Sequence, residues 1–544
     1  MKKILFVFCA FAILASCNDG FLDRTPYNQI SSTIIWKSDA NAIMGVNGIY
    51  MNSKREWAMM GFPYHFTRCG PDGFEMWRTS EMERNTATSR SGFFLGTYRE
   101  FYRMIRGAND AIYNLTDNPD VTPDLAKRLV GEAKFFRGLS YFILWHFFGG
   151  VIILDEPILP QNTYLPRNTA EEVKEFLIKD LTDAIDLLPV VHAEADYGRI
   201  TKGAAIALLG KVYLFDQQWG KAVEQFGKLL SSPYSYNLHP EYWQLFDFKW
   251  EKNDEVVYAV QMIDQLDLGS SMEEWYGMRS THQYAQSYCF PSSLTFETYT
   301  HADGEPIDLI SRPKRSDYDT EFDYGVVLME WYEDLLKSDL DKRLQGNIII
   351  PTDTFLGARN EIYKKYWPYE DYLTASPPPI FQDLTTLARF HWRKFVNTGT
   401  ENVTRWNSPN DIPIIRFADV LLMYAEALNE QSGPVAEVYQ SVNRVRTRSG
   451  IVDLPEGLSK DEMRRMIWME RFHEFPGEGH LFFDVRRWKT AHTTDPIFGL
   501  NHNVLDFRGE VDFTRVFVER NYLWPIPQAE IELNDKLTQN PGWE

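Results

Sequence analysis

Small and aromatic residues recur at fixed spacings between residues 203 and 233, and this pattern constrains the fold more than any other feature of the chain. The residues that carry it are Leu209, Gly210, Tyr213, Ala222, Phe226 and Pro233. Gly210 and Ala222 are small where two antiparallel helices would cross closely, and Tyr213 and Phe226 have the size to fill the space beside them. Residues 217–220 can form the turn. The segment is therefore predicted to fold as an antiparallel helix pair.

These offsets are typical of a tetratricopeptide repeat. The Gly-x-x-Tyr step recurs at Gly138 and Tyr141, inside a helix predicted at residues 124–147, and a weaker form of the pattern recurs at 416–447. Such helix pairs cannot bury their apolar faces alone and need neighbours. Repeats near both ends of the chain therefore predict a mainly α fold with one shared helical scaffold.

Capping signals place several helix boundaries. Ser38 is a candidate N-cap, and the segments that start with Thr169 and Ser459 are capping boxes because each has a glutamate three residues later. The first of these two helices is predicted to end near Leu187, and the second near Glu474. A helix is also predicted at about residues 327–337.

Residues 234–410 lack clear helical periodicity outside that last helix. They contain short strand-like runs such as 255–262 and the proline-rich stretch 376–379. We predict a large irregular insertion with short β hairpins. The chain is then divided into a signal peptide (1–16), a lipidated tether (17–35), an N-terminal helical region (36–233), the insertion (234–410) and a C-terminal region (411–544).

The first residues predict export. Met1-Lys2-Lys3 is a basic start, residues 4–12 are apolar, and Leu14-Ala15-Ser16-Cys17 follows. The apolar run is too short to cross a bilayer, so it fits a secretory signal. The last four residues resemble the bacterial lipobox, in which the peptidase cuts before a cysteine that carries a diacylglycerol. The resemblance implies that Cys17 is the lipidation site, and acyl chains there would hold the protein on a membrane.

Composition limits the partners. The chain has 544 residues and a formal net charge of −20, which argues against nucleic acid as a partner. Apart from Cys17, only Cys69 and Cys289 remain after removal of the signal peptide, and the sequence leaves open whether they form a disulfide. No spacing of cysteine and histidine predicts a metal site or a cofactor.

The chain resembles the SusD/RagB family of outer-membrane nutrient-binding lipoproteins along almost its whole length. The motifs that carry the resemblance are the lipobox, Phe21-Leu22-Asp23, Asn47-Gly48-Ile49-Tyr50, residues 132–137, Phe148-Gly149-Gly150, Asp341-Lys342-Arg343, Arg393-Lys394-Phe395, residues 411–427, Asn443-Arg444-Val445-Arg446, Asp484-Val485-Arg486-Arg487-Trp488, Trp524-Pro525-Ile526-Pro527 and Asn540-Pro541-Gly542-Trp543. Each motif alone is weak, but their order along the chain is specific.

This resemblance implies a scaffold of tetratricopeptide helix pairs that supports a variable, loop-rich region. It also implies lipid anchoring at the cell outer membrane, facing the exterior. The implied partner is a SusC-like TonB-dependent transporter, and the implied ligand is an oligosaccharide or polysaccharide. The implied role is capture without catalysis.

Glycan binding combines flat aromatic faces, which cover the C–H side of a sugar, with planar polar groups that bind its hydroxyls. In similar proteins the site lies in variable loops, which correspond here to about residues 54–100 and 264–300. The first stretch also contains Trp57 and Tyr64. The candidate ligand-binding residues are Asp72, Trp77, Arg78, Trp275, Tyr276, Arg279, Tyr284 and Trp367. Any one of the aromatic residues could instead belong to the core.

Other functions receive less support. A tetratricopeptide scaffold could bind a peptide or other surface lipoproteins, and this is the alternative hypothesis. A hydrolase is disfavoured because the chain has no nucleophile elbow, and His473 and His480 are too far apart for a zinc-protease helix. Asp484, Arg486 and Arg487 invite a catalytic interpretation, but we expect ion pairs that tie the C-terminal helices to the scaffold.

Overall fold

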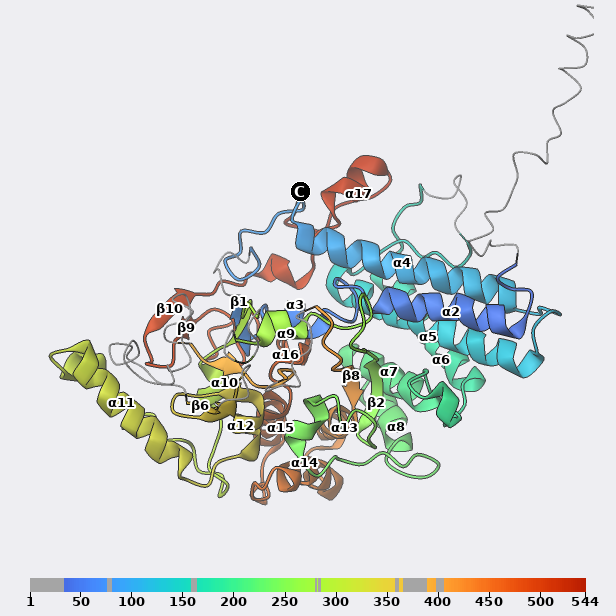
Figure 1. Ribbon diagram of the computed structural model, residues 1–544. Helices are drawn as coiled ribbons and strands as arrows, with labels where there is room; N and C mark the ends of the chain where they lie inside the picture. The colour runs from blue at the N-terminus through green and yellow to red at the C-terminus, as the bar shows by residue number, and fades with distance from the viewer. Residues whose placement is uncertain are drawn as a thin grey trace, which may run out of the picture.

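The structure is a computed structural model that describes residues 34–75, 81–157, 164–278, 281, 285–357, 389–397 and 406–544, and the backbone alone of 362–364. Long helices from the N-terminal third form one side of the molecule, and helices from the C-terminal third pack beside them (Figure 1). The N-terminal helices are α2 (Asp39–Ser53), α3 (Phe62–Thr67), α4 (Gly92–Leu115), α5 (Pro123–Phe148), α6 (Ala170–Leu187), α7 (Lys202–Phe215) and α8 (Trp219–Lys228).

The helix pairs follow the predicted pattern. A Cβ atom added to Gly210 on α7 would lie 2.6 Å from the ring of Phe226 on α8, and one added to Gly138 on α5 would lie 2.9 Å from Leu181 on α6. Both glycines therefore permit the close helix crossings that the sequence predicted. The C-terminal helices are α13 (Phe417–Ser432), α14 (Ala436–Arg448), α15 (Lys460–Glu474), α16 (His480–Arg487) and α17 (Gln528–Leu533).

The capping predictions are confirmed. Ser38 accepts a hydrogen bond from the backbone of Asn41, and both capping boxes form, at the start of α6 and of α15. These two helices end at Leu187 and Glu474, as predicted. Within the described residues, no helix is both long enough and apolar enough to span a bilayer.

Residues 234–410 contain short elements between irregular segments. The helices are the 3₁₀ turn η4 (Tyr242–Phe246), α9 (Met272–Tyr276), α10 (Leu294–Glu297), α11 (Glu321–Leu336) and α12 (Lys342–Asn347). The helix predicted at 327–337 is therefore longer than expected. It projects from the rest of the molecule at the left of Figure 1.

The strands form two-stranded antiparallel sheets. The pairs are β1 (Gly73–Glu75) with β3 (Cys289–Pro291), β2 (Val256–Val260) with β8 (Ile412–Arg416), β4 (Ile348–Ile349) with β7 (His391–Trp392), β5 (Thr354–Leu356) with β6 (Ile362–Lys364), and β9 (Asn503–Leu505) with β10 (Val511–Thr514). The strand predicted at 255–262 is β2. Most pairs join segments far apart in the chain rather than local hairpins.

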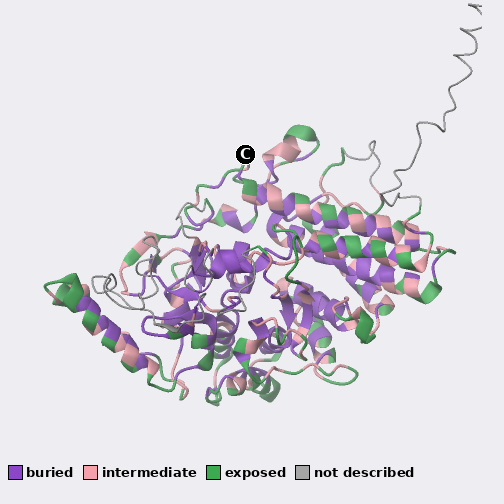
Figure 2. Cartoon of the chain, in the orientation of Figure 1, coloured by how far each residue is buried: buried purple, intermediate pink, exposed green. Residues whose placement is uncertain are grey.

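One large hydrophobic core connects most of the described residues, and smaller clusters around Phe290 and Phe498 are separate from it. Its members run from Trp36 near the start of the described chain to Trp543 at its end. Surface helices alternate between buried and exposed residues, whereas the segments around α3, α9 and α16 are almost wholly buried (Figure 2). The shared scaffold of a mainly helical fold with an irregular insertion is therefore confirmed.

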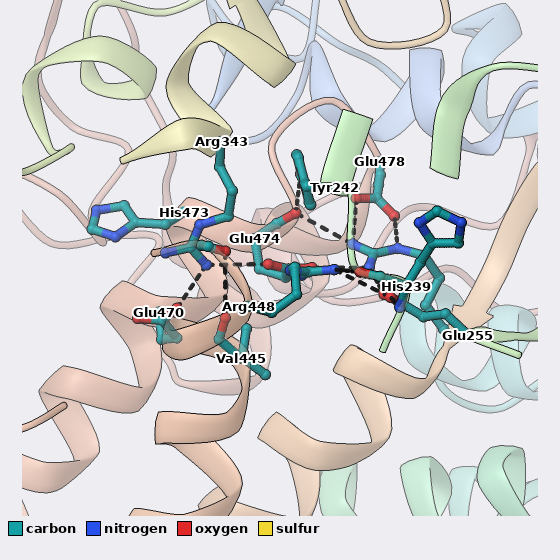
Figure 3. A network of polar contacts seen from close by, with 12 residues as sticks. His239, Tyr242, Glu255, Arg343, Val445, Arg448, Glu470, His473, Glu474 and Glu478 are labelled. Carbon is teal, nitrogen blue, oxygen red and sulfur yellow. Dashed lines mark hydrogen bonds and ion pairs between the residues drawn. The ribbon is translucent and has the colours of Figure 1, made fainter. Parts of the chain in front are cut away.

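A buried charge network fastens the insertion to the C-terminal helices. Arg416, at the end of β8, donates to Glu474 at 2.9 Å and to both carboxylate oxygens of Glu478 at 2.8 Å. Glu474 also pairs with Arg343 and Arg448, which come from α12 and α14 (Figure 3). Because every charge in this network has a partner of opposite sign, these ions can be buried together.

Candidate functional site

The two sequence regions predicted to carry the ligand site meet in the structure. Strand β1 pairs with β3 in a register that places Glu75 opposite Cys289. Glu75, the last residue of β1, and Cys289, the first residue of β3, therefore lie at the same end of this small sheet. Nearby, helix α3 from the first region packs on α9 from the second.

Stacked aromatic rings join these two helices. The ring of Tyr64 on α3 stacks on Trp275 on α9, with centroids 4.6 Å apart, and Trp57 stacks on His65 at 4.0 Å. Trp57, Tyr64, His65, Phe93 and Trp275 form what we call the aromatic cluster. Burial, assisted by Arg68, lowers the pKa of His65 well below its usual value, so this histidine is neutral at physiological pH.

Arg68 orders the polar edge of the aromatic cluster. Its guanidinium lies 4.7 Å from the centre of the Tyr64 ring and donates to the Tyr64 hydroxyl at 3.2 Å and to Glu75 at 3.0 Å. Arg68 and Glu75 are only partly buried. This edge therefore offers fixed planar polar groups beside aromatic rings, which suits hydrogen bonds to hydroxyl groups.

Several partly accessible side chains belong to the cluster or to segments close to it in the chain or bonded to α9. Trp57, Gln286 and Tyr288 are half-buried, and Trp406 is 58% exposed while its indole N–H donates to Glu274. We call Trp57, Arg68, Glu75, Gln286, Tyr288 and Trp406 the rim. Sequence analysis noted Trp57 but missed Arg68, Glu75, Gln286 and Trp406. Arg68 could have been found, because it lies one helical turn after Tyr64.

Two of the predicted ligand-binding residues are buried, so for them the prediction is wrong in this structure. The carboxylate of Asp72 is 0% exposed and accepts from the backbone N–H of Gly477 at 2.9 Å. Burial raises its pKa to about 7. Tyr276 is also 0% exposed, and its hydroxyl donates to the carbonyl of Gly477 at 2.9 Å. Both side chains hold one peptide segment in place and offer no surface to a ligand.

Trp275 also requires a correction. It is only 6% exposed, and Tyr64 covers one of its faces. The two preceding glutamates suggested an exposed helix, but Glu273 is buried, where it accepts two hydrogen bonds from Asn397, and Glu274 accepts from Trp406. In this structure Trp275 therefore packs against the ring of Tyr64 instead of facing a ligand.

The remaining predicted residues lie outside the described residues. They are Cys17, Trp77, Arg78, Arg279, Tyr284 and Trp367. In sequence, Trp77 and Arg78 follow Glu75 closely, Arg279 follows Met278, and Tyr284 precedes Ala285. Four of the six residues therefore flank segments that carry members of the rim or of the aromatic cluster. Their roles stay predictions.

Residues that resembled catalytic groups have structural partners. Asp484 accepts from Arg471 at 2.8 Å and from Arg487 at 2.9 Å, and Arg486 donates to the backbone carbonyls of Asn521 and Tyr522. The Arg471–Asp484 pair joins α15 to α16, as expected, whereas Arg486 binds backbone carbonyls instead of a carboxylate. Cys69 and Cys289 are buried free thiols, not a disulfide. Among the described residues, no group of three or more His, Cys, Asp or Glu is placed to hold a metal ion.

The fold and this loop-borne site define the class: a helix-pair scaffold that carries a variable recognition region. A family model described as "SusD family" matches residues 254–543, and another, described as "Starch-binding associating with outer membrane", matches residues 20–214. The chain belongs to the SusD family. This confirms the resemblance inferred from its motifs, and the family points to an association with the outer membrane.

Individual relatives cover the whole chain. The SusD-like protein P25 of Formosa agariphila is 25% identical over 99% of this chain and 97% of its own length. A SusD-like carbohydrate binding protein of Bacteroides fragilis superposes with a TM-score of 0.77 and 20% identity, covering 93% of this chain and 100% of its own. A laminarin binding SusD-like protein superposes with a TM-score of 0.66 and 22% identity, covering 93% and 100%. These two solved structures share the fold of this chain.

Proposed function

We propose that the protein is a non-catalytic, cell-surface glycan-binding lipoprotein that delivers its ligand to a SusC-like TonB-dependent transporter. The observation that carries the proposal is the meeting of the two variable regions around a stacked pair of rings, Tyr64 and Trp275, with a partly accessible polar edge. A carbohydrate binding protein and a laminarin binding protein are among the solved structures with this fold, which supports a glycan as the ligand.

The chemistry of the rim supports a sugar ligand. Sugar rings have apolar C–H faces that pack on indole and phenol rings. Their hydroxyls accept hydrogen bonds from planar polar groups or donate hydrogen bonds to them. Trp57, Tyr288 and Trp406 supply partly accessible rings, and Arg68 and Glu75 supply the planar polar groups. Trp77, Arg78, Arg279, Tyr284 and Trp367 would add further contacts from the flanking segments.

The absence of catalysis is part of the proposal. A glycosidase needs two carboxylates in different environments that act on one glycosidic bond. Along the rim, Glu75 pairs with Arg68 and Glu274 accepts from Trp406, so both carboxylates already serve as structural acceptors. This arrangement favours binding over hydrolysis.

Affinity electrophoresis against starch, laminarin and a panel of other polysaccharides tests the proposal. We expect retardation by at least one polysaccharide and no release of reducing sugar. Trp77→Ala should reduce the retardation by loss of a stacking contact worth about 0.5–1.5 kcal/mol. Trp250→Ala is the matched control, because Trp250 is an exposed tryptophan that lies outside the rim.

Delivery is tested by purifying the full-length protein from membranes of cells that express its neighbouring transporter gene. Co-purification of a large outer-membrane barrel protein is expected. Binding of a peptide library without any polysaccharide binding would instead favour the scaffold hypothesis, and sugar release would favour a hydrolase.

A further inference from the structure

A cavity lies apart from the aromatic cluster and the rim. It has a volume of about 590 Å³, within the range of about 300–1,000 Å³ that small-molecule sites occupy. Its walls come from η4 and the residues after it, from α12, from the start of β5 and from residues 393–397. None of its lining residues belongs to the rim.

One wall of this cavity is an exposed indole. Trp243 is 51% exposed, whereas its neighbours on η4, Tyr242 and Phe246, are 5% and 6% exposed and anchor the turn in the core. Helix α12 fits closely against this turn, since a Cβ atom on Gly346 would lie 3.0 Å from the Tyr242 ring. The position of Trp243 is therefore fixed by buried residues, while much of its own side chain stays open to solvent.

Other residues of the lining carry planar polar groups. Arg393 pairs with Asp353 at 2.5 Å, and Gln345 lies 3.5 Å from the other oxygen of that carboxylate. Asn397 lines the cavity as well, and its backbone and side-chain N–H groups donate to Glu273. A guanidinium, a carboxylate and two carboxamides are therefore held in place by one another and by buried partners.

The charges of the lining balance. Arg393 is neutralised by Asp353, and Lys394 by the buried Glu478 at 2.9 Å. The remaining pair, Lys342 and Asp247, are of opposite sign. A cavity without excess positive charge gives no electrostatic advantage to phosphates or other anions. An aromatic ring and neutral or compensated planar groups in one lining instead match the apolar C–H faces and the hydroxyls of an uncharged sugar.

From this arrangement we infer that the cavity is a second carbohydrate site that takes a short segment of a neutral glycan, with one sugar ring packed on Trp243. The inference rests on the proposed function, because it assumes that the protein meets glycans. The hydrogen bonds between Asn397 and Glu273 join this cavity to α9, the helix that carries Trp275. A long glycan that contacts both sites would gain affinity through its higher local concentration at the second site.

Fluorine NMR of the protein labelled with 5-fluorotryptophan can test the site with a set of defined oligosaccharides, so the natural glycan need not be identified first. The Trp243 resonance is assigned by its loss in Trp243→Phe. The probes are maltoheptaose, laminarihexaose, cellohexaose, mannohexaose, xylohexaose and an acidic control, tetragalacturonate. We expect at least one neutral probe to shift the Trp243 resonance in a saturable way and tetragalacturonate to leave it unchanged.

Calorimetry with the probe that acts provides the second measurement. Trp243→Ala should weaken binding at this site roughly twofold to tenfold, which corresponds to the usual energy of a ring contact. Gln345→Ala, a change at an exposed position, should also weaken binding, whereas Trp250→Ala should not, because Trp250 is similarly exposed at 46% but does not line the cavity.

The outcomes separate this inference from the proposed function. Neutral probes that shift other tryptophan resonances but never that of Trp243 would overturn the second site and leave the proposed function standing. A shift caused only by tetragalacturonate would overturn the assignment to neutral glycans. No resonance shift with any probe, together with no retardation by any polysaccharide, would overturn both.

Discussion

Trp275 gains its importance from packing. Its indole is 6% exposed and stacks on Tyr64 within the aromatic cluster. Truncation to alanine removes a large buried ring and leaves a cavity, which typically costs about 3–5 kcal/mol. We expect Trp275→Ala to lower the urea midpoint strongly, whereas Trp243→Ala, at a half-exposed position, should change stability by about 0.5 kcal/mol or less. If Trp275→Ala unfolded like the wild type and lost only glycan affinity, the residue would be ligand-facing after all.

Glu273 gives a pH dependence that can be measured. Burial raises its pKa to about 8, and the hydrogen bonds that Asn397 donates offset only part of this shift. In the unfolded chain the carboxyl titrates near 4.3. Between these two values the folded state binds more protons than the unfolded state, so this group makes stability fall as the pH rises.

Glu273→Gln should therefore remove part of that loss. The amide can still accept from Asn397 but does not ionise. We expect the variant to be more stable than the wild type at pH 8, by on the order of 2 kcal/mol, and the difference to shrink towards pH 5. Urea unfolding at several pH values measures this effect, and Glu224→Gln on the exposed side of α8 is the control. A difference that grew towards acidic pH would contradict the assignment.

Glu273 and Glu274 show why the burial of a single residue was mispredicted from the sequence. Adjacent acidic residues usually mark a solvated face, which favoured exposure of Trp275. Their actual partners, Asn397 and Trp406, lie more than 120 positions away in the chain. Nothing local to residues 272–276 encodes these contacts, so the burial of the helix could not be predicted from its own sequence.

At the scale of helices and strands, two helical glycines allow the effect of side-chain packing to be distinguished from the effect of helix propensity. Gly210 on α7 faces Phe226, and an added Cβ atom would lie 2.6 Å from that ring. Gly227 on α8 has its nearest neighbour at 3.8 Å, an ordinary contact. Both glycines are inside helices, where alanine is intrinsically favoured by about 1 kcal/mol.

We therefore expect opposite effects from the same substitution. Gly210→Ala should destabilise the protein by about 1–3 kcal/mol, since overpacking outweighs the gain in helix propensity. Gly227→Ala should stabilise it by about 0.5–1 kcal/mol. Chemical denaturation of the two variants measures both values. Stabilisation by Gly210→Ala would mean that α7 and α8 do not cross as closely as the structure shows.

The helices and strand β2 were predictable from local sequence, whereas the pairing of the short strands was not, for a physical reason. Capping boxes and the small and large positions of helix pairs lie within a few turns of one another, so the sequence displays them locally. Strands β1 and β3 are three residues long and pair across more than 200 positions. Such short strands show no alternation, and their pairing depends on the finished scaffold. The two candidate regions could be named from the sequence, but their pairing through β1 and β3 could not.

At the scale of the whole molecule, the sequence predicts that Cys17 determines location through a lipid anchor. The lipobox prediction assigns the membrane anchor to Cys17, while the rest of the chain contributes no spanning helix among the described residues. Cys17→Ala should therefore release the protein from the membrane fraction, because acyl chains supply about 0.8 kcal/mol per buried methylene. Fractionation of cells with an antibody detects the change. Full retention of the variant in the membrane fraction would refute lipid anchoring as the sole attachment.

The buried charge network connects segments that are distant in the chain. Glu255 adjoins β2 in the insertion, Arg416 ends β8, and Glu478 follows α15. All three side chains are fully buried. The network therefore couples the stability of the insertion to that of the C-terminal helices.

Removal of one member should unbalance the network. Arg416→Met removes one of the cations that pair with Glu478, while Lys394 still pairs with it. The buried charge network then carries one uncompensated negative charge. An uncompensated buried charge typically costs about 3–5 kcal/mol, so we expect a large drop in the unfolding midpoint. Lys228→Ala, which breaks the exposed pair with Glu224, should cost at most about 1 kcal/mol. In the double variant Arg416→Met/Glu478→Gln the surplus charge is removed, so its loss should be smaller than the sum of the single losses. Strictly additive losses would show that Arg416 and Glu478 do not stabilise each other, which would contradict the role assigned to their ion pair.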